Sequence, residues 1–474
     1  MKECLYILLP VHNRCEITKK FIDCLVAQTY QNFHLVLIDD GSIDGTEQMV
    51  REKIDNLTVL KGNGSWWWAG CLQQGYDWLK ENKINDSDTI LIINDDVIIE
   101  KDFLAKGKSL LSAGNQSILL AQFRFSADSQ PIETGIDADL KHLSFANASS
   151  PEKINCLSTR GIFLKWSDFL IIGGFHPRLL PHYWSDYEFT IRANRKGYKC
   201  LTSPEISLLP MLQESGRQDL DYSSFFSLLS SLFSTKSIPN PVHKISFIFL
   251  ACPVKWWPRN FFRIFFETTK IILSYPLREL KERLAILSIK KEIRNYKGEY
   301  KVVMGAGETK YPGWITTDYP ALDITEPESM SKYFDRDSIK AILSEHVFEH
   351  LTLQQAESAL EICREYLSPG GYVRIAVPDG LHPSKKYIDN VKPGGSGAGS
   401  DDHKILYNHT TITELIRKAG FKVKLLEWYD CDGEFNFVDW QPETGMVRRS
   451  SRYDPRNSDS ELNYTSLIVD AINP

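Results

Sequence analysis

The first hundred residues alternate short apolar runs with segments of helical periodicity. Four apolar runs predict strands, at residues 5–10, 34–39, 57–60 and 89–93. Three intervening segments repeat apolar positions at helical spacing, at residues 17–27, 46–53 and 71–81. Alternation of strand and helix predicts a mostly parallel, doubly wound α/β sheet, with helices on both faces. In such a sheet ligands bind at the carboxyl ends of the strands.

A second pattern of the same kind begins at Tyr300. Apolar runs predict strands at residues 300–304, 314–317, 341–344, 372–377 and 422–427, with a glycine turn before the fourth. Helical periodicity returns at residues 354–366 and 411–419. The sequence therefore predicts a second doubly wound domain. It shares a fold class with the first but no motif.

The segment between the two patterns, residues 216–298, is rich in aromatic and basic side chains. Phe261, Phe262, Phe265 and Ile272 form a broad apolar stripe on a predicted helix. Burial against the first domain and contact with a membrane surface through residues 240–275 are the two alternatives for this stripe. Leucines 277, 280, 284 and 287 predict a connector helix, for which a short coiled-coil dimer contact is the alternative.

Length and composition fit this division. A chain of 474 residues is too long for one ordinary domain, and the predicted domains span residues 1–215, 216–298 and 299–474.

The net charge of −6 argues against a nucleic-acid-binding protein. Nine dispersed cysteines without a CxxC pair argue against a disulfide framework and a structural zinc site. With no signal peptide and no apolar run near the roughly 20 residues of a membrane span, the sequence predicts a cytoplasmic protein, with the inner face of the cell membrane as a peripheral location.

Acidic side chains follow the strands of the first domain. Asp39 and Asp40 come after the second predicted strand, and Asn94-Asp95-Asp96 comes after the fourth. Carboxylates there can accept hydrogen bonds from a nucleotide, and hard oxygen ligands suit Mg²⁺ or Mn²⁺. Further along, Asp186 is a candidate general base. Transfer of a sugar from a nucleotide diphosphate needs these three elements: a nucleotide site, a neutralised diphosphate and a base.

Taken in order, these motifs resemble the inverting glycosyltransferases of family 2, which have the GT-A fold. The matching motifs are Pro10-Val11, Asp39-Asp40-Gly41-Ser42, Asn94-Asp95-Asp96, Gly173-Gly174-Phe175 and Ser185-Asp186, over about residues 3–215. The resemblance implies that Pro10, Asp39 and Asp40 hold the nucleotide of a UDP- or dTDP-sugar. It also implies that Asp95 faces the sugar diphosphate, that Asp96 binds the metal, and that Asp186 is the base. The chain departs from the family in having Asn94 and Ser185 where an acid is common.

The tryptophan-rich segment of residues 62–70 resembles rhamnosyltransferase-like members that act on bacterial surface polysaccharides. This implies a glycan or lipid-linked glycan acceptor. Within the segment, Trp67 is a candidate stacking wall for a sugar ring, and packing in the core is the alternative.

In the second domain, Gly305-Ala306-Gly307 directly follows a strand, and Asp318 ends the next one. Glycines let the chain pass close to a ligand, and an acid at that place can bind ribose hydroxyls. Dinucleotide binding is an alternative for a GxG motif alone. However, Gly307 and Asp318 are closer together than the roughly 20 residues of the dinucleotide fingerprint, and no third glycine follows.

The wider pattern resembles class I S-adenosylmethionine-dependent methyltransferases over about residues 300–427. The matching strings include Ser344-Glu-His-Val-Phe-Glu-His350, Leu367-Ser-Pro-Gly-Gly371 and Val377-Pro-Asp379. The resemblance implies that Gly305, Gly307 and Asp318 hold the cofactor's methionine and ribose, with Asp323 near the adenine. Glu345 and His346 would line the methyl site. The candidate bases for a sugar hydroxyl are His346, His350 and His403, of which His346 and His403 are preferred.

The leading hypothesis from the sequence is therefore a bifunctional enzyme that transfers a sugar and methylates a glycan hydroxyl. In the alternative, the second domain binds the cofactor without catalysis, as a regulatory or docking module. A non-catalytic membrane-associated scaffold is the third hypothesis.

Overall fold

The computed structural model describes residues 3–114, 116–124, 131–211, 220–307, 311–457 and 462–474. The chain divides into two compact units, Met1–Tyr275 and Pro276–Pro474. The aromatic-rich segment of residues 216–298 contributes to both units, because the boundary lies within one long helix.

The N-terminal unit is built on an eight-stranded sheet of order β3-β2-β1-β4-β9-β6-β10-β5. Its strands are β1 (Leu5–Val11), β2 (Phe33–Asp39), β3 (Leu57–Lys61), β4 (Thr89–Ile92), β5 (Val97–Ile99), β6 (Ser117–Phe123), β9 (Ile162–Lys165) and β10 (Lys199–Pro210). The first four are mutually parallel, whereas β9 is antiparallel to both β4 and β6. The order reverses direction at β1, which has β2 on one side and β4 on the other.

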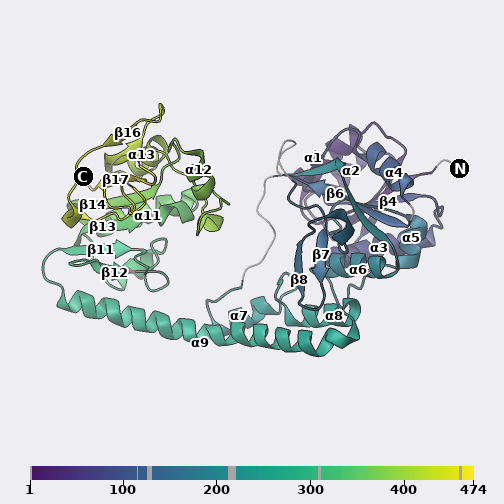
Figure 1. Ribbon diagram of the computed structural model, residues 1–474, viewed down its shortest axis with the longest axis horizontal. Coiled ribbons are helices and arrows are strands. Elements are labelled where there is room, and N and C mark those ends of the chain that lie inside the picture. Colours follow the sequence, from purple (N-terminus) through teal and green to yellow (C-terminus); the bar gives the residue numbers. More distant parts are fainter. Residues whose placement is uncertain (1–2, 115, 125–130, 212–219, 308–310, 458–461) are drawn as a thin grey trace. The chain divides into compact units, whose positions relative to one another are not determined.

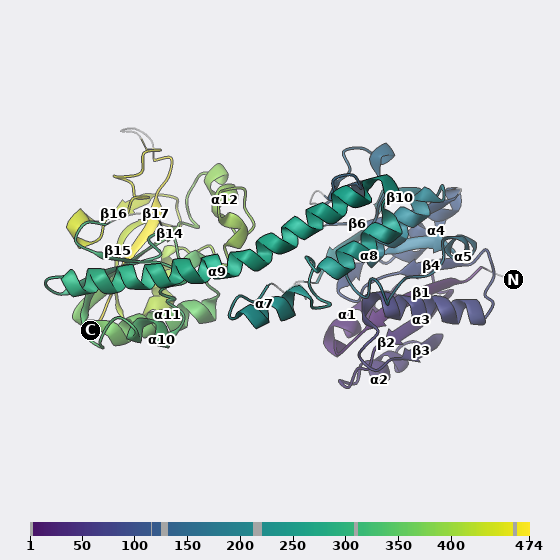
Figure 2. The ribbon, with the colours of Figure 1, turned by 90° about the horizontal axis from the view of Figure 1, so that it is seen from below.

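Helices cover both faces of this sheet (Figures 1 and 2). One apolar cluster joins the sheet to α1 (Cys15–Val26), α2 (Thr46–Arg51) and α4 (Phe103–Ala113). The other joins it to α3 (Trp67–Glu81), α5 (Trp166–Ile172) and α6 (Ser185–Arg195). The predicted doubly wound arrangement and its first four strands are confirmed. The third helix begins four residues earlier than predicted, at Trp67 rather than residue 71.

A helical hairpin packs against the side of the N-terminal unit. The elements here are the β7 (Ile136–Asp139) and β8 (Ser144–Asn147) pair, α7 (Phe225–Leu232), α8 (Pro241–Ala251) and α9 (Trp257–Asn295). Phe247, Ile248 and Ile264 are buried in one cluster with Ile136 of β7. Among the described residues, no helix is both long enough and apolar enough to span a bilayer. The buried face of the α8–α9 hairpin, which carries Phe247, Ile248 and Ile264, attaches the hairpin to the rest of the unit.

The C-terminal unit has a seven-stranded sheet of order β12-β11-β13-β14-β17-β15-β16. Its strands are β11 (Tyr300–Met304), β12 (Ile315–Thr317), β13 (Ile339–Glu345), β14 (Leu367–Pro378), β15 (Lys422–Tyr429), β16 (Phe435–Phe437) and β17 (Ser466–Ile472). Strands β12, β11, β13 and β14 are parallel. The last strand, β17, is inserted antiparallel between β14 and β15. The predicted glycine turn at Gly370 falls inside β14, which begins at Leu367.

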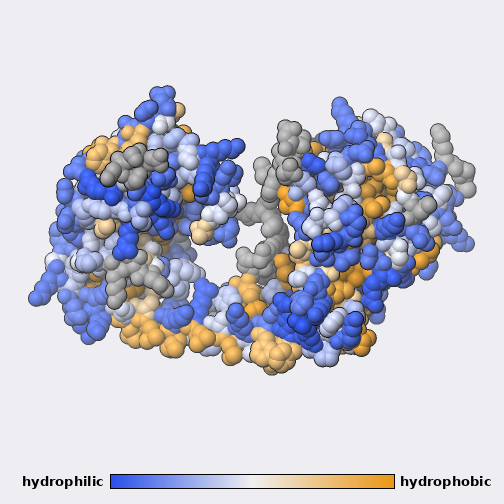
Figure 3. Space-filling view, in the orientation of Figure 1, coloured by the Kyte–Doolittle hydropathy of each residue, from blue (hydrophilic) through white to orange (hydrophobic). Residues whose placement is uncertain are grey.

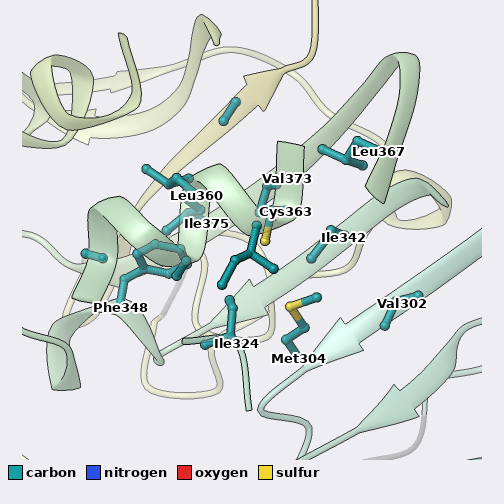
Figure 4. Packing of buried hydrophobic residues seen from close by; sticks show 14 of the residues in the cluster. Val302, Met304, Ile324, Ile342, Phe348, Leu360, Cys363, Leu367, Val373 and Ile375 are labelled. Carbon is teal, nitrogen blue, oxygen red and sulfur yellow. The ribbon is translucent and has the colours of Figure 1, made fainter. Parts of the chain in front are cut away.

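The two faces of the second sheet are covered differently. On one face, the large apolar cluster includes side chains of α10 (Pro327–Ser331), α11 (Leu353–Tyr366) and α13 (His409–Lys418). The remaining short helix, α12 (Lys385–Val391), contributes no residue to this cluster. Figure 4 shows side chains of β11, β13 and β14 meeting Leu360 and Cys363 of α11. On the other face, Trp314, Trp440 and Val447 come from segments without α-helix. The described part of this unit therefore departs from the prediction of helices on both faces.

Candidate active site

The predicted N-terminal site lies where the strand order reverses. Strands β1, β2 and β4 are parallel neighbours, so their carboxyl ends meet at one edge of the sheet. Asp39 ends β2, and Asp95 and Asp96 follow β4. Pro10 lies in β1 and is buried, one residue before the strand ends at Val11. The edge at such a reversal point is where open α/β sheets bind ligands.

The two aspartates after β2 have different surroundings, although both are 5 % exposed. Asp39 accepts a hydrogen bond from the backbone N–H of Ser42 (2.8 Å) through one oxygen. Asp40 accepts bonds from Gly64 (2.8 Å), Trp66 (2.9 Å) and Trp67 (3.1 Å) through both oxygens. Asp40 thus holds the tryptophan-rich loop in place, a role that the sequence did not predict. Nucleotide contact by either carboxylate stays a prediction.

The three tryptophans of residues 66–68 are all half-buried but differ in their contacts. Trp66 and Trp68 pack against the apolar cluster under α3, and Trp68 also donates a hydrogen bond to Thr159 (3.1 Å). Trp67 lies outside that cluster, with its ring 6.0 Å from the ring of His182 and 5.8 Å from the Lys236 ammonium. It has a positive φ of 56°. Stacking of the Trp67 ring on a sugar stays a prediction.

Arg14, just after β1, joins the two acids that follow β4. Its guanidinium lies 3.1 Å from Asp95 and 3.3 Å from Asp96. Asp95 also accepts a hydrogen bond from Thr18 (2.7 Å) and is 2 % exposed. Burial raises the pKa of Asp95, and the charge of Arg14 opposes that rise. The Asp96 side chain is 34 % exposed, so it is the more accessible of the two carboxylates for a cation.

Asp186 lies in the first turn of α6, after a left-handed residue at Trp184. Its side chain is half-buried and accepts a hydrogen bond from the Tyr187 N–H (2.9 Å). Burial raises the pKa of Asp186 to about 6; the Glu133 charge adds to the rise and Arg160 opposes it. A carboxylate with this pKa is basic enough to take a proton near neutral pH.

The loop before Asp186 is tied to the tryptophan-rich loop. The Ala69 N–H donates to the Pro181 carbonyl (3.0 Å), and the Ser185 hydroxyl donates to the His182 carbonyl (2.7 Å). These bonds place the loop of residues 181–186 beside Trp67. Asp40, Trp67 and the loop that leads into α6, where Asp186 lies, are therefore connected.

The Gly173-Gly174-Phe175 motif is held by residues that the sequence analysis left without a role. Arg192 donates to the carbonyls of Ile172 (2.6 Å) and Gly174 (2.7 Å), and it forms a bidentate ion pair with buried Glu188. A Cβ on Gly174 would lie 2.2 Å from Gln73 Oε1. The motif is thus built as a rigid support for the first turn of α6.

In the C-terminal unit, the glycine motif follows β11 as predicted. Gly305 (φ 73°) and Gly307 (φ 56°) are left-handed, a conformation that favours glycine. A Cβ on Gly305 would lie 2.3 Å from Val347, whereas no described atom lies within 4 Å of that position on Gly307. Asp318 directly follows β12 and is exposed, and its carboxylate accepts a hydrogen bond from the Tyr319 N–H (2.9 Å).

Two further acids predicted for this site already serve the fold. Asp323 accepts hydrogen bonds from the backbone (2.9 Å) and hydroxyl (2.7 Å) of Thr325 within a turn. Glu345, at the end of β13, accepts bonds from the Arg449 N–H (2.9 Å) and the Tyr311 hydroxyl (3.2 Å). Their proposed contacts with adenine and the methyl site stay predictions.

The two predicted bases lie in different settings. His346 (φ 58°) has Nε2 3.0 Å from the Ser466 hydroxyl and Nδ1 2.7 Å from Glu349. Its side chain is 9 % exposed. His403 is half-buried, and its Nδ1 lies 2.7 Å from the Val391 carbonyl. Their roles as bases stay predictions.

Residues 6–163, about a third of the chain, match the family model of glycosyl transferase family 2. The N-terminal region contains a glycosyltransferase family 2 domain. The matched range includes the first four strands, Asp39, Asp40 and the Asp95–Asp96 pair. The family 2 domain has an α/β fold with a GT-A-like sheet. Asp186 lies beyond the matched residues.

Curated relatives agree with this assignment at low identity. The chain is 24 % identical over 202 residues to glycosyltransferase AglE of Haloferax volcanii, covering 40 % of this chain and 62 % of the relative. It is 25 % identical over 210 residues to the amylovoran biosynthesis glycosyltransferase AmsB of Erwinia amylovora, covering 41 % and 64 %. The chain thus spans less than two thirds of the length of either relative.

Solved structures similar to the chain include the mannosyltransferase PcManGT of Pyrobaculum calidifontis in complex with GDP-Man and Mn²⁺. That match has a TM-score of 0.34 at 16 % identity and covers 54 % of this chain and 72 % of the other. Residues 1–349 of S. aureus TarS in complex with UDP-GlcNAc match with a TM-score of 0.36 at 14 % identity, covering 62 % and 86 %.

Three supporting residues of the N-terminal unit escaped the sequence analysis: Arg14, Gln73 and Glu188. Arg14 and Gln73 act through partners far away in sequence, whereas Glu188 pairs with Arg192 one helical turn on. Arg14 pairs with acids about 80 residues on, and Gln73 accepts a hydrogen bond from the Phe175 N–H (2.6 Å). Only the pairing of the strands brings these partners together.

Proposed function

We propose that the N-terminal unit is an inverting glycosyltransferase that takes its sugar from a UDP- or dTDP-sugar. The observation that carries the proposal is the meeting of carboxylates from β2 and β4 at the reversal point of the sheet, within the family 2 match. A base of raised pKa, Asp186, lies in the first turn of α6, directly after the connected loop. The acceptor is a glycan or lipid-linked glycan of a bacterial surface polysaccharide.

A divalent cation fits the carboxylates after β4. Asp96 is the proposed ligand, since it is the accessible member of the pair, and hard oxygen donors suit Mg²⁺ or Mn²⁺. Such an ion supplies positive charge to a diphosphate leaving group. Arg14 already neutralises part of the acidic charge, and it holds Asp95 and Asp96 in a fixed geometry.

The remaining residues have assigned parts in this proposal. Asp39 and Asp40 hold the nucleotide, and Asp40 also positions the loop that presents Trp67. The Trp67 ring offers an apolar face to a sugar. The Asp186 carboxylate takes the proton of the acceptor hydroxyl as that oxygen attacks the anomeric carbon.

The metal assignment predicts a loss of nucleotide affinity in Asp96→Ala. We expect calorimetric titration of UDP or dTDP into Mn²⁺-saturated full-length protein to show about 10- to 100-fold weaker binding, which corresponds to about 1.5–3 kcal/mol for a lost charged contact. Asp23→Ala, which removes an exposed carboxylate paired with Lys53, is the control and should bind normally. Equal affinity in Asp96→Ala and the parent protein would refute Asp96 as the ligand.

We further propose that the C-terminal unit is an S-adenosylmethionine-dependent methyltransferase acting on a sugar hydroxyl of the same glycan. The order β12-β11-β13-β14 has a reversal point at β11, and the glycine motif and Asp318 lie at the carboxyl ends there. The antiparallel insertion of β17 between β14 and β15 differs from the all-parallel dinucleotide-binding order.

The glycine motif fits the proposed cofactor, which supplies the methyl group. Gly307 has no described atom within 4 Å of a Cβ position, as a ligand passing close to the backbone requires, and the Asp318 carboxylate is exposed to accept ribose hydroxyls. Glu345, His346 and Asp323 complete the proposed site. Two activities on one chain raise the local concentration of their shared glycan. The alternative remains a cofactor-binding docking module without methyl transfer.

We also propose that the hairpin of α8 and α9 contacts an anionic membrane surface at the cytoplasmic face. On the solvent side of α9, Phe262 is 64 % exposed, Phe265 64 % and Phe266 52 % (Figure 3). Residues 241–275 hold five lysines or arginines against one acid, in a chain of net charge −6. Exposed aromatic rings among cations are typical of helices that lie in a lipid interface.

This proposal predicts that full-length protein sediments with phosphatidylglycerol-containing vesicles at low salt. The triple change Phe262→Ser, Phe265→Ser and Phe266→Ser should abolish sedimentation, because it removes the apolar contact. Ile43→Ser, at a 92 % exposed position elsewhere in the unit, should leave it unchanged. Undiminished vesicle binding by the triple variant would overturn the proposal. The proposal would also be overturned if, in analytical ultracentrifugation without lipid, the triple variant had a lower mass than the parent protein. That result would make this face a dimer contact.

A further inference from the structure

A cluster of histidines and carboxylates in the C-terminal unit has no part in the proposed cofactor site. Glu349, His350 and His403 each offer a ligand atom, and these atoms all lie within 4.8 Å of one another. Glu349 and His350 belong to a short 3-10 helix, Phe348–His350, just after β13. His403 follows a second such turn, Ser400–Asp402. Segments more than fifty residues apart thus converge on one point.

Glu349 is the unusual member of this cluster. It is completely buried; its Oε1 lies 2.7 Å from His346 Nδ1, and no described residue forms a hydrogen bond with its Oε2. The hydroxyl of Tyr407 is also buried without a described partner, and the charge of Glu349 adds to the rise that burial causes in the pKa of Tyr407. A buried carboxylate is costly unless it is paired or binds a metal.

The neighbouring contacts orient each side chain toward a common ligand. His403 Nδ1 lies 2.7 Å from the Val391 carbonyl, and His350 Nδ1 lies 3.3 Å from Asp402, which leaves each Nε2 available. His346 Nδ1 lies 2.7 Å from Glu349 Oε1. Histidines that bind metals commonly donate their other ring N–H to a carbonyl or carboxylate. Lys404, 3.0 Å from Asp402, is the one cation in a described contact with this group.

We propose that Glu349, His350 and His403 bind a divalent transition-metal ion, with His346 and Asp402 positioning the ligands. Two imidazoles with one carboxylate suit Zn²⁺ or Mn²⁺ better than Mg²⁺ or Ca²⁺, which prefer oxygen ligands throughout. Three protein ligands leave coordination positions open to a substrate.

The site lies beside the proposed cofactor motif. Val347, two residues before Glu349, is the residue that a Cβ on Gly305 would meet. If the unit is the proposed methyltransferase, the ion holds neighbouring hydroxyls of the sugar acceptor and makes them more acidic. His403 is then a ligand and not the base. This last step rests on the proposed function, whereas the metal site itself does not.

Metal binding by the full-length chain tests the site. All proteins carry Asp96→Ala to remove the proposed N-terminal ion, and each is dialysed against Zn²⁺ or, separately, Mn²⁺. We expect one ion per chain by mass spectrometry for one of the two metals, and a higher Tm with that metal. His350→Ala and His403→Ala should lose the ion and the Tm shift, and Asp402→Asn should weaken binding about 10- to 100-fold.

His409→Ala is the matched control, since His409 is a half-buried histidine of the same unit that contacts the Tyr429 carbonyl (3.1 Å) instead. It should keep one ion. The proposal is overturned if neither metal binds, or if His350→Ala and His403→Ala retain it. Titration with S-adenosylmethionine separates the two proposals. Metal binding without cofactor binding would refute only the methyltransferase, and cofactor binding without metal would refute only the metal site.

Discussion

Asp186→Asn is expected to lower the rate of sugar transfer about 10²- to 10⁴-fold while nucleotide binding is retained. The asparagine has nearly the same shape and can still accept the Tyr187 N–H bond, so the first turn of α6 should persist. What it loses is the ability to take the proton of the acceptor hydroxyl. Initial rates with a UDP- or dTDP-sugar and a glycan acceptor measure the loss, and calorimetry with UDP checks the nucleotide site.

The pH profile distinguishes a base from a residue that only supports the site. Because the carboxylate is the active form and the pKa of Asp186 is about 6, transfer should fall as the pH drops below about 6 and level off above it. The residual activity of Asp186→Asn should lack this step. Asp168→Asn is the control, since burial also raises the pKa of half-buried Asp168 in α5. A parent-like rate in Asp186→Asn would exclude Asp186 as the base.

Local patterns were enough to predict the strand ends of the N-terminal unit. Asp39 and the Asp95–Asp96 pair follow apolar runs whose parallel pairing is implied by the helices between them. The placement of these acids at one edge of the sheet follows from that pairing. The positive φ values at Gly305 and Gly307 are likewise what a glycine motif after a strand predicts.

Contacts between distant segments could not be predicted in this way. The period of a strand does not reveal its neighbour, so the insertion of β17 between β14 and β15 was missed. The three backbone bonds to Asp40 depend on the path of a loop more than twenty residues away. The raised pKa of Asp186 depends on burial by the whole unit, and the convergence of His350 with His403 depends on two separate turns.

Asp318→Ala is expected to weaken S-adenosylmethionine binding about 100-fold in the full-length protein. The exposed carboxylate after β12 would lose hydrogen bonds to two ribose hydroxyls, about 3 kcal/mol together. UDP binding should be unchanged, because the N-terminal site lies in the other unit. Calorimetric titration with each ligand separately measures both. Loss of both affinities would indicate unfolding, and loss of neither would remove Asp318 from the site.

A matched pair of glycines tests the same site without changing a charge. Gly307 and Gly370 are both left-handed (φ 56° and 74°), and for both no described atom lies within 4 Å of an added Cβ. Alanine should therefore strain either backbone by a similar amount, about 1–2 kcal/mol. Gly370 lies near the start of β14, away from the carboxyl edge, so only Gly307→Ala places its methyl group where the cofactor passes. If the two variants bind S-adenosylmethionine equally well, the cofactor does not lie against this motif. If Gly307→Ala alone loses binding but the parent protein methylates no glycan, the unit is the docking module instead.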